Sequence, residues 1–382
     1  MATKKAKEFV AWKKLKGEDW SKLLQSQPQF ADKCDWAKLE TTDWSALLAK
    51  QPQLLEKCGC NDFEKKWIFS DGRLIAAQPQ FADRCDFGSV TNAGWRAILT
   101  AVRDFDSKCD FSKFSSMELA MVLESRTDLI DAVDLSAFDG DAWCALVSGN
   151  PDLANRCDWS KLDANQVARV VAICPQFADK CDFTALDGWA WAQLLAKQPQ
   201  FADKCAWDKL SRDPFTGDSD WSDLLSKQPQ FINKCDTGDL SASDWLAILK
   251  EQPQLADKCD WEDWDGEKWA ELLSVRPSFA DRCDWSAIGD YDWPTLLAAQ
   301  PQFVDKCDFA RLDGGAIATI LALQPQLAEK CDLTKIDHQS TWTKLLKAQP
   351  QFADKCTLWS KFKGDDWAEV LSAQPQIAVM RV

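Results

Sequence analysis

One eight-residue phrase, Gln-Pro-Gln-Phe-Ala-Asp-Lys-Cys, occurs unchanged at residues 27–34, 198–205 and 349–356, and close variants recur about every 24 residues. Val10, Val133 and Arg381 take the place of its cysteine in three further copies. The chain of 382 residues thus holds about fifteen units, with insertions at 59–72 and 210–220 and degenerate units at 100–134. A unit this short cannot bury its apolar face alone. The sequence therefore predicts a single continuous repeat domain over residues 1–382, in which each unit stacks on its neighbours.

Each unit carries the pattern of two short helices. Trp44, Leu47 and Leu48 fall at i, i+3 and i+4, on one face of an α-helix. Pro52 ends that helix because proline has no N–H to donate, and it is also a good first residue for a second helix. Asp43, just before the tryptophan, is a candidate N-cap. We therefore expect an all-α solenoid or superhelix of about fifteen 24-residue repeats, each a longer α-helix plus a short α- or 3-10 helix.

A leucine pair followed by proline, as in Leu194-Leu195 before Pro199, recurs with the 24-residue period. This pattern resembles the leucine-rich repeat variant family over about residues 12–379. The resemblance implies a right-handed superhelix of alternating α- and 3-10 helices. It covers the architecture only, and no functional residue is carried over from the family.

The charge of the chain limits its partners. The sequence has 45 Lys and Arg against 60 Asp and Glu, a net charge of −15. Nucleic acid and anionic membrane surfaces attract basic proteins, so we expect neither as a partner. The N-terminal segment has no signal-peptide pattern, and no run of apolar residues approaches the roughly 18 needed to span a bilayer. We expect a cytoplasmic monomer.

The cysteines at the end of the phrase are called slot cysteines, and their spacing favours a role as buried core residues. Zinc ligands cluster in sequence, and stacked repeats would separate equivalent cysteines by about 8–10 Å, beyond the disulfide Cα limit of about 7 Å. Valine at equivalent positions also favours a small buried side chain. The predicted structural core comprises Trp44, Leu47, Leu48, Pro52, Cys34, Cys181, Cys205 and Cys259. No metal site is expected, and a redox pair of Cys58 and Cys60 is the alternative use of the thiols.

Tryptophan and glutamine each recur at one position of the unit. The helix-start tryptophans, such as Trp44 and Trp191, form either an exposed platform for sugar rings and peptide aromatics or a core ladder between layers. The glutamine before the proline, such as Gln51 and Gln198, either bonds its counterparts in a ladder or satisfies the open carbonyls of a helix end. A row of amides facing a ligand is the third alternative.

Asp-Lys pairs before the slot cysteines predict charged stripes. These stripes are either a solvated face with pairing between neighbouring units or a groove for a partner. Insertions in repeat proteins map to loops that often form the binding face, so 59–72 and 210–220 are candidate contact loops. The candidate partner contacts are Lys33, Lys180, Lys204, Lys258, Asp213, Phe215, Asp218 and Asp220. The Asp after the slot cysteine, such as Asp182, is expected to cap the following turn.

Motifs for catalysis are missing from the sequence. Its one histidine, His338, lies beside a predicted turn, and none of the common nucleotide-binding, hydrolase or metalloprotease motifs occurs. We therefore expect no enzyme, no catalytic residue and no cofactor. The expected function is a repeat scaffold that binds a protein or peptide partner along its solenoid surface. The alternatives are a carbohydrate or cell-surface binder that uses exposed tryptophan rows, and an acidic mimic of nucleic acid.

Overall fold

The computed structural model describes residues 9–212 and 219–379. Over those ranges the chain is all-α, with helices in successive packed pairs, and its β pairing is limited to one bridge between Arg212 and Ser219. The predicted all-α solenoid of repeats is confirmed. Two compact units divide the chain: unit 1 comprises Met1–Cys109 and Asp290–Val382, and unit 2 comprises Asp110–Gly289. That residues 1–382 form one domain stays a prediction.

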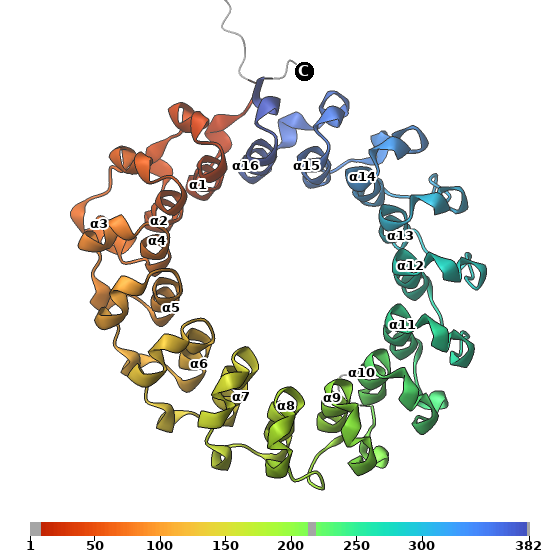
Figure 1. Cartoon of the computed structure of the whole chain (residues 1–382). Coiled ribbons are helices and arrows are strands. Elements are labelled where there is room, and N and C mark those ends of the chain that lie inside the picture. The colour runs from red at the N-terminus through yellow and green to blue at the C-terminus, as the bar shows by residue number, and fades with distance from the viewer. Residues whose placement is uncertain (1–8, 213–218, 380–382) are drawn as a thin grey trace, which may run out of the picture. The chain divides into compact units, whose positions relative to one another are not determined.

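The repeats contain α-helices that are in most cases longer than the 3-10 helices, and the insertion at 59–72 adds one further α-helix, α3 (Figure 1). In unit 1 these are α1 (Gly17–Ser26), α2 (Thr41–Lys50), α3 (Asp62–Phe69), α4 (Gly72–Ala77), α5 (Asn92–Ala101), α13 (Trp293–Ala299), α14 (Gly314–Leu323), α15 (Gln339–Ala348) and α16 (Gly364–Ala373). In unit 2 they are α6 (Ser116–Ser125), α7 (Gly140–Gly149), α8 (Ala164–Ile173), α9 (Gly188–Lys197), α10 (Asp220–Lys227), α11 (Ala242–Glu251) and α12 (Gly266–Val275).

A 3-10 helix follows, and in most repeats it begins at the proline. In unit 1 these are η2 (Pro28–Lys33), η4 (Pro52–Lys57), η5 (Pro79–Arg84), η7 (Arg103–Lys108), η20 (Pro301–Lys306), η21 (Pro325–Lys330), η23 (Pro350–Lys355) and η25 (Pro375–Val379). In unit 2 they are η9 (Thr127–Ala132), η11 (Pro151–Arg156), η13 (Pro175–Lys180), η14 (Pro199–Lys204), η16 (Pro229–Lys234), η18 (Pro253–Lys258) and η19 (Pro277–Asp281).

Many repeats add a third, one-turn helix before the next α-helix. In unit 1 these are η1 (Trp12–Lys14), η3 (Trp36–Lys38), η6 (Phe87–Ser89), η22 (Leu333–Lys335) and η24 (Trp359–Lys361). In unit 2 they are η8 (Phe111–Lys113), η10 (Leu135–Ala137), η12 (Trp159–Lys161), η15 (Trp207–Lys209) and η17 (Thr237–Asp239). The carboxylate after the slot cysteine caps the turn that follows it, as expected: Asp182 accepts the backbone N–H of Thr184 at 3.0 Å.

Most of the α-helices begin about one turn earlier than the sequence predicted, although α13 has the predicted N-cap, Asp292, just before Trp293. Asp43 is not the N-cap of α2, because Glu40 takes that place and the Asp43 carboxylate accepts the backbone N–H of Glu40 at 2.9 Å. In α9 the N-cap is Asp187, which accepts the N–H of Ala190 at 2.8 Å. In α2 the acidic residue before the tryptophan, Asp43, therefore reaches back to the cap in the manner of a capping box.

The helix face marked by the Trp-Leu-Leu pattern forms the core. Trp44 is 1% exposed, and Leu47 and Leu48 are 0% exposed. Pro52 opens η4 and is half-buried. Burial of each leucine contributes about 1.5–3 kcal/mol, and the recurrence of the pattern extends this core from one repeat to the next.

Where the phrase keeps its first glutamine, that side chain joins most such repeats to the repeat before it. In unit 2, the Gln198 side-chain amide donates to the carbonyl of Ala172 in the preceding α-helix at 2.9 Å, and Gln200 donates to the Gln198 side-chain oxygen at 2.8 Å. Equivalent bonds to the preceding repeat are made by Gln51, Gln78, Gln228, Gln252, Gln324, Gln349 and Gln374. Of the alternatives for this row, the structure selects the bond to an open carbonyl at a helix end.

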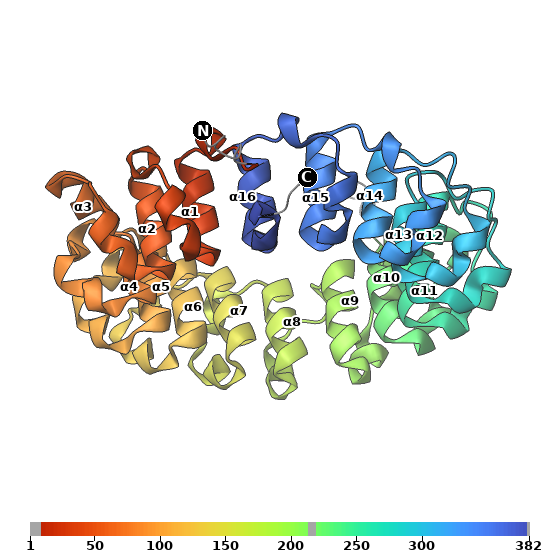
Figure 2. The same ribbon diagram turned by 90° about the horizontal axis from the view of Figure 1, so that it is seen from above.

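The first and last repeats of the chain pack on each other within unit 1. Figures 1 and 2 show α1 and α16 side by side, and the two helices are in direct contact. The Gln27 amide donates to the carbonyl of Ser372 at 2.8 Å. Lys14 donates to the carbonyls of Ser360 at 3.1 Å and Phe362 at 2.5 Å. We call this contact the terminal junction.

The insertion at 59–72 is not a loop, in contrast to the expectation. It forms α3, which starts with a capping box: Asn61 accepts the N–H of Glu64 at 2.9 Å, and the Glu64 carboxylate accepts the N–H of Asn61 at 2.8 Å. Ile68 and Phe69 are 1% and 3% exposed. A capped start followed by buried apolar residues is sufficient to make the inserted segment helical.

Candidate functional site

The single histidine of the sequence, His338, caps the N-terminus of a helix. His338 is exposed, stands at the N-cap of α15 and places Nδ1 2.8 Å from the Ser340 hydroxyl. In the part of the chain that the structure describes, no three His, Cys, Asp or Glu side chains are grouped as metal ligands.

The slot cysteines lie at the edge of the core. They follow the last residue of the second helix, as Cys34 follows η2, and most of them are only partly covered, whereas Cys157 and Cys356 are buried. The expectation of a buried core position is corrected for Cys34, Cys181, Cys205 and Cys259, which are half-buried. Partial burial still raises the pKa of the Cys205 thiol to about 12. Such a group is a protonated, weak nucleophile at neutral pH.

The thiol of Cys60 has the opposite electrostatics to a redox thiol. Burial, followed by a hydrogen bond with Cys58, raises the pKa of Cys60 to about 12. A redox thiol needs a lowered pKa, so Cys60 does not resemble an activated thiol.

The helix-start tryptophans are core residues and form no exposed platform. Trp36, in the one-turn helix, is half-buried and stacks on the helix-start Trp44 with ring centroids 5.5 Å apart. The helix-start side chains are at most 7% exposed at Trp20, Trp44, Trp95, Trp143, Trp191, Trp221, Trp245, Trp269, Trp293, Trp342 and Trp367. A carbohydrate or peptide therefore has no access to this row.

The basic residues of the predicted stripe are distributed one per repeat. Lys33 and Lys258 are exposed at the ends of η2 and η18. Lys180 lies 3.3 Å from the neighbouring Asp179, and Lys204 lies over the Phe183 ring at 4.3 Å. Cations at the same position pair with the preceding repeat, as Arg156 does with Asp131 and Arg282 with Asp257, both at 2.8 Å. Acidic and basic groups therefore alternate along this edge, and these lysines share no pocket.

The second insertion is only partly described. Asp213, Phe215 and Asp218, like the final slot residue Arg381, lie outside the described residues. Asp220 is the first residue of α10, and its carboxylate accepts the backbone N–H of Ser211 at 2.9 Å. Asp220 therefore joins the two ends of the insertion.

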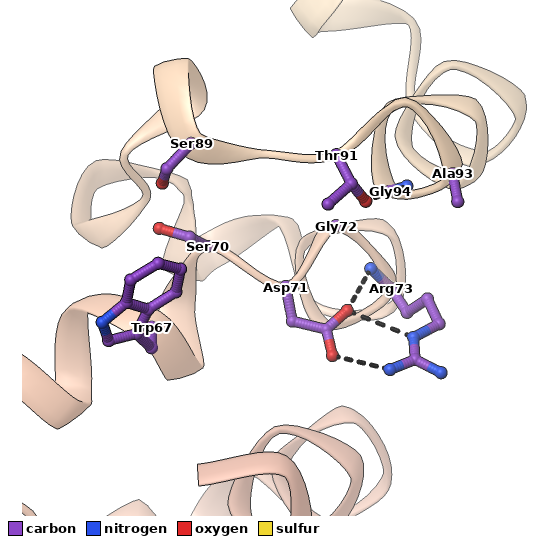
Figure 3. A pocket seen from close by; sticks show the side chains of 9 residues that line it. All are labelled: Trp67, Ser70, Asp71, Gly72, Arg73, Ser89, Thr91, Ala93 and Gly94. Atoms are coloured by element: carbon purple, nitrogen blue, oxygen red, sulfur yellow. Dashed lines mark hydrogen bonds and ion pairs between the residues drawn. The ribbon is translucent and has the colours of Figure 1, made fainter.

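The first insertion contributes to a pocket of about 400 Å³, called the insertion pocket (Figure 3). Trp67 of α3, which is 54% exposed, lies on one side of it, and the hydroxyls of Ser70, Ser89 and Thr91 lie around it. Its arginine is already engaged, because Arg73 donates from Nε and Nη2 to the two oxygens of Asp71 at 3.2 and 3.0 Å.

A second pocket, of about 240 Å³, lies on the exposed face of α8 and α9 in unit 2 and is called the α8–α9 groove. Trp189 is 46% exposed there. Arg169 and Lys197 are both exposed and line the groove, with no carboxylate among its lining residues. Ion pairs of these two cations are missing from the described part of the chain. In a protein of net charge −15 this is a local site of positive charge beside an aromatic surface.

Sequence reasoning missed both exposed tryptophans. Trp189 is the first tryptophan of Gly-Trp-Ala-Trp, two residues before the helix-start Trp191, and Trp67 lies in an insertion. Both are outside the repeated position. Their position outside the 24-residue pattern of tryptophans was the signal that could have identified them.

Comparison with known proteins provides no relative. A scan against models of protein families finds no match to this chain, and a search of curated proteins finds no matching sequence. The resemblance to leucine-rich repeat variants stays a prediction. Within residues 9–212 and 219–379, no helix is both long enough and apolar enough to cross a membrane.

Proposed function

We propose that this protein is a non-enzymatic repeat scaffold that binds an acidic segment of a protein partner in the α8–α9 groove. One observation carries the proposal: Arg169 and Lys197, two exposed cations without a carboxylate partner in the described chain, line the same pocket as the exposed ring of Trp189.

The chemistry of the groove favours a segment with alternating carboxylate and apolar side chains. Arg169 and Lys197 suit carboxylates through charge-assisted hydrogen bonds. Trp189 and the half-buried Ile173 offer an apolar surface for an aromatic or aliphatic side chain. The Gln193 amide, which donates to Asp223 at 3.2 Å, retains a carbonyl oxygen for a backbone N–H of the partner. These groups lie on rigid helices, which lowers the entropic cost of binding.

A labelled peptide with one phenylalanine flanked by glutamates tests the proposal by fluorescence anisotropy. We expect saturable binding that weakens with salt, and no binding of the matched peptide in which lysines replace the glutamates. Arg169→Ala/Lys197→Ala should weaken binding at least about tenfold, because two charge-assisted contacts are lost. Lys227→Ala, at the position of α10 equivalent to Lys197, is the control and should bind as the unsubstituted protein does. Equal affinity for both peptides would contradict the proposal.

The insertion pocket favours a second candidate, a carbohydrate. An exposed indole ring beside three hydroxyl side chains and the Asp71 carboxylate offers stacking and hydrogen bonds together, as sugars require. Screening of immobilised glycans with the protein and with Trp67→Ala tests this alternative. Binding lost in Trp67→Ala and retained in Trp189→Ala would support a sugar site, and an absence of glycan binding would exclude it.

A further inference from the structure

Both terminal repeats follow the internal template. Solenoids usually end in capping repeats with a polar outer face, because an uncapped end exposes its apolar surface. Here α1 buries Trp20 and Leu23, and α16 buries Trp367 and Val370, all at most 1% exposed. The two helices α1 and α16 pack directly on each other at the terminal junction.

The terminal junction repeats the glutamine bond of an internal junction. At the junction of α1 and α2, the Gln51 amide donates to the carbonyl of Gln25, two residues before Gln27, at 2.8 Å. At the terminal junction the Gln27 amide donates to Ser372, two residues before the glutamine that ends α16, also at 2.8 Å.

The lysine bonds are repeated as well. Lys38 donates to the carbonyls of Lys13 at 3.0 Å and Leu15 at 2.7 Å, the residues on either side of Lys14. Lys14 in turn donates to Ser360 and Phe362, the residues on either side of the matching lysine of η24. The last repeat therefore presents to the first repeat the same acceptors that Lys13 and Leu15 present to Lys38 at an internal junction.

Charged and aromatic side chains add to the terminal junction. Lys22 of α1 lies 3.1 Å from Glu369 of α16, which also accepts from Lys347 of the preceding α15 at 2.7 Å. The Phe9 ring lies edge-on to Trp359, with centroids 5.0 Å apart. The two end surfaces are thus complementary in hydrogen bonding and charge.

We propose that the end surface of the last repeat is also a binding site for the first repeat of a second copy of this chain. The surface that the first repeat covers is the same whether that repeat belongs to the same molecule or to another. Within one molecule the junction is favoured because the linked ends have a high effective concentration, and it keeps the chain monomeric. When the junction opens, two copies can exchange terminal repeats and form a swapped dimer, in which every junction is satisfied.

Refolding at two protein concentrations tests this proposal on the full chain. The denatured protein is refolded at about 1 µM and at about 1 mM, near the effective concentration of a tethered contact. Light scattering after size exclusion should report monomer from the dilute sample and a dimer fraction from the concentrated one, with the same helix content by circular dichroism. A monomer alone at the higher concentration would overturn the proposal.

Two matched variants separate a swapped dimer from other association. Lys14→Ala/Gln27→Ala removes side-chain bonds that the closed monomer and the swapped dimer both contain once per chain, so it should leave the dimer-to-monomer ratio within about twofold of the unsubstituted protein. It should raise at least about tenfold the rate at which the isolated dimer returns to monomer on dilution, because the terminal junction must open first. Lys38→Ala/Gln51→Ala removes the equivalent bonds at an internal junction and should leave that rate within about twofold of the unsubstituted protein. Equal rates in the two variants would contradict exchange through the terminal junction.

Discussion

The side-chain amide of Gln27 donates to the carbonyl of Ser372, 345 residues further along the chain, at 2.8 Å. Gln198 makes the same bond to Ala172, only 26 residues away, at 2.9 Å. One glutamine position therefore joins neighbouring repeats and also joins the two ends of unit 1. The bond forms wherever two repeats are packed side by side, whether or not they are neighbours in sequence.

Replacing this glutamine should lower stability at either kind of junction. Gln198→Ala and Gln27→Ala each leave a partly buried carbonyl without its donor, at a cost of about 1–2 kcal/mol in the free energy of unfolding. Gln200→Ala removes only an exposed bond to Gln198 and should cost less than about 0.5 kcal/mol. Urea unfolding followed by circular dichroism measures the three values. A cost for Gln200→Ala equal to that for Gln198→Ala would contradict the structural role of the bond between repeats.

Alanine at two glycines should have effects of opposite sign. A Cβ on Gly364 would overlap the Lys14 carbonyl and the Asp19 carboxylate, so Gly364→Ala should separate the terminal repeats and cost at least about 1 kcal/mol. Gly315, near the start of α14, has its nearest neighbour, a carboxylate oxygen of Asp313, at 3.3 Å. Gly315→Ala should stabilise the protein by about 0.4–1 kcal/mol, because alanine lowers the conformational entropy of the unfolded chain. Thermal unfolding tests the pair, and a gain in stability from Gly364→Ala would show that the junction is loosely packed.

Two buried tryptophans should differ in their tolerance of phenylalanine. The Trp342 indole N–H donates to the carbonyl of Ile336 at 3.0 Å, whereas the Trp191 N–H has no partner in the described residues. Both substitutions remove similar volume, but only Trp342→Phe leaves an acceptor unsatisfied. Trp342→Phe should therefore be more destabilising than Trp191→Phe by about 1 kcal/mol in urea unfolding. The reverse order would contradict the hydrogen-bond assignment.

Alkaline pH should destabilise the fold through its thiols. Burial raises the pKa of Cys34 and Cys205 from an ordinary value of 9.0 to about 12. A raised pKa means that the folded state retains a proton that the unfolded chain releases, so this stability is present below pH 9 and is lost as the pH rises toward 12. In Cys205→Val the urea midpoint should fall less between pH 8 and pH 10, a range set by those pKa values, than in the unsubstituted protein. Identical pH profiles would show that Cys205 ionises equally in both states.

The repeat architecture was predictable because its signals are local. The Trp44-Leu47-Leu48 face and the stop at Pro52 specify an α-helix followed by a 3-10 helix without reference to distant residues. The N-cap of α2 was predicted wrongly at Asp43 for the same reason. From local sequence alone, this carboxylate can be an N-cap or the third helical residue of a capping box.

Contacts between repeats could not be predicted in the same way. The acceptor of Gln27 depends on the orientation of every packed pair in unit 1, and small differences in helix packing add along the chain. The groove residues were missed for another reason. Arg169, Trp189 and Lys197 look like ordinary surface residues in sequence, and only the stacking of α8 on α9 places them around one pocket.

Amide hydrogen exchange with the glutamate-phenylalanine peptide tests most directly where a partner binds. The account predicts slower exchange on peptide addition in residues 148–197, which include α8 and α9, and unchanged exchange around Trp67. The protection should disappear in Arg169→Ala/Lys197→Ala. Protection centred on α3 and α4, or none at a peptide concentration that saturates anisotropy, would contradict the assignment of the α8–α9 groove as the binding site.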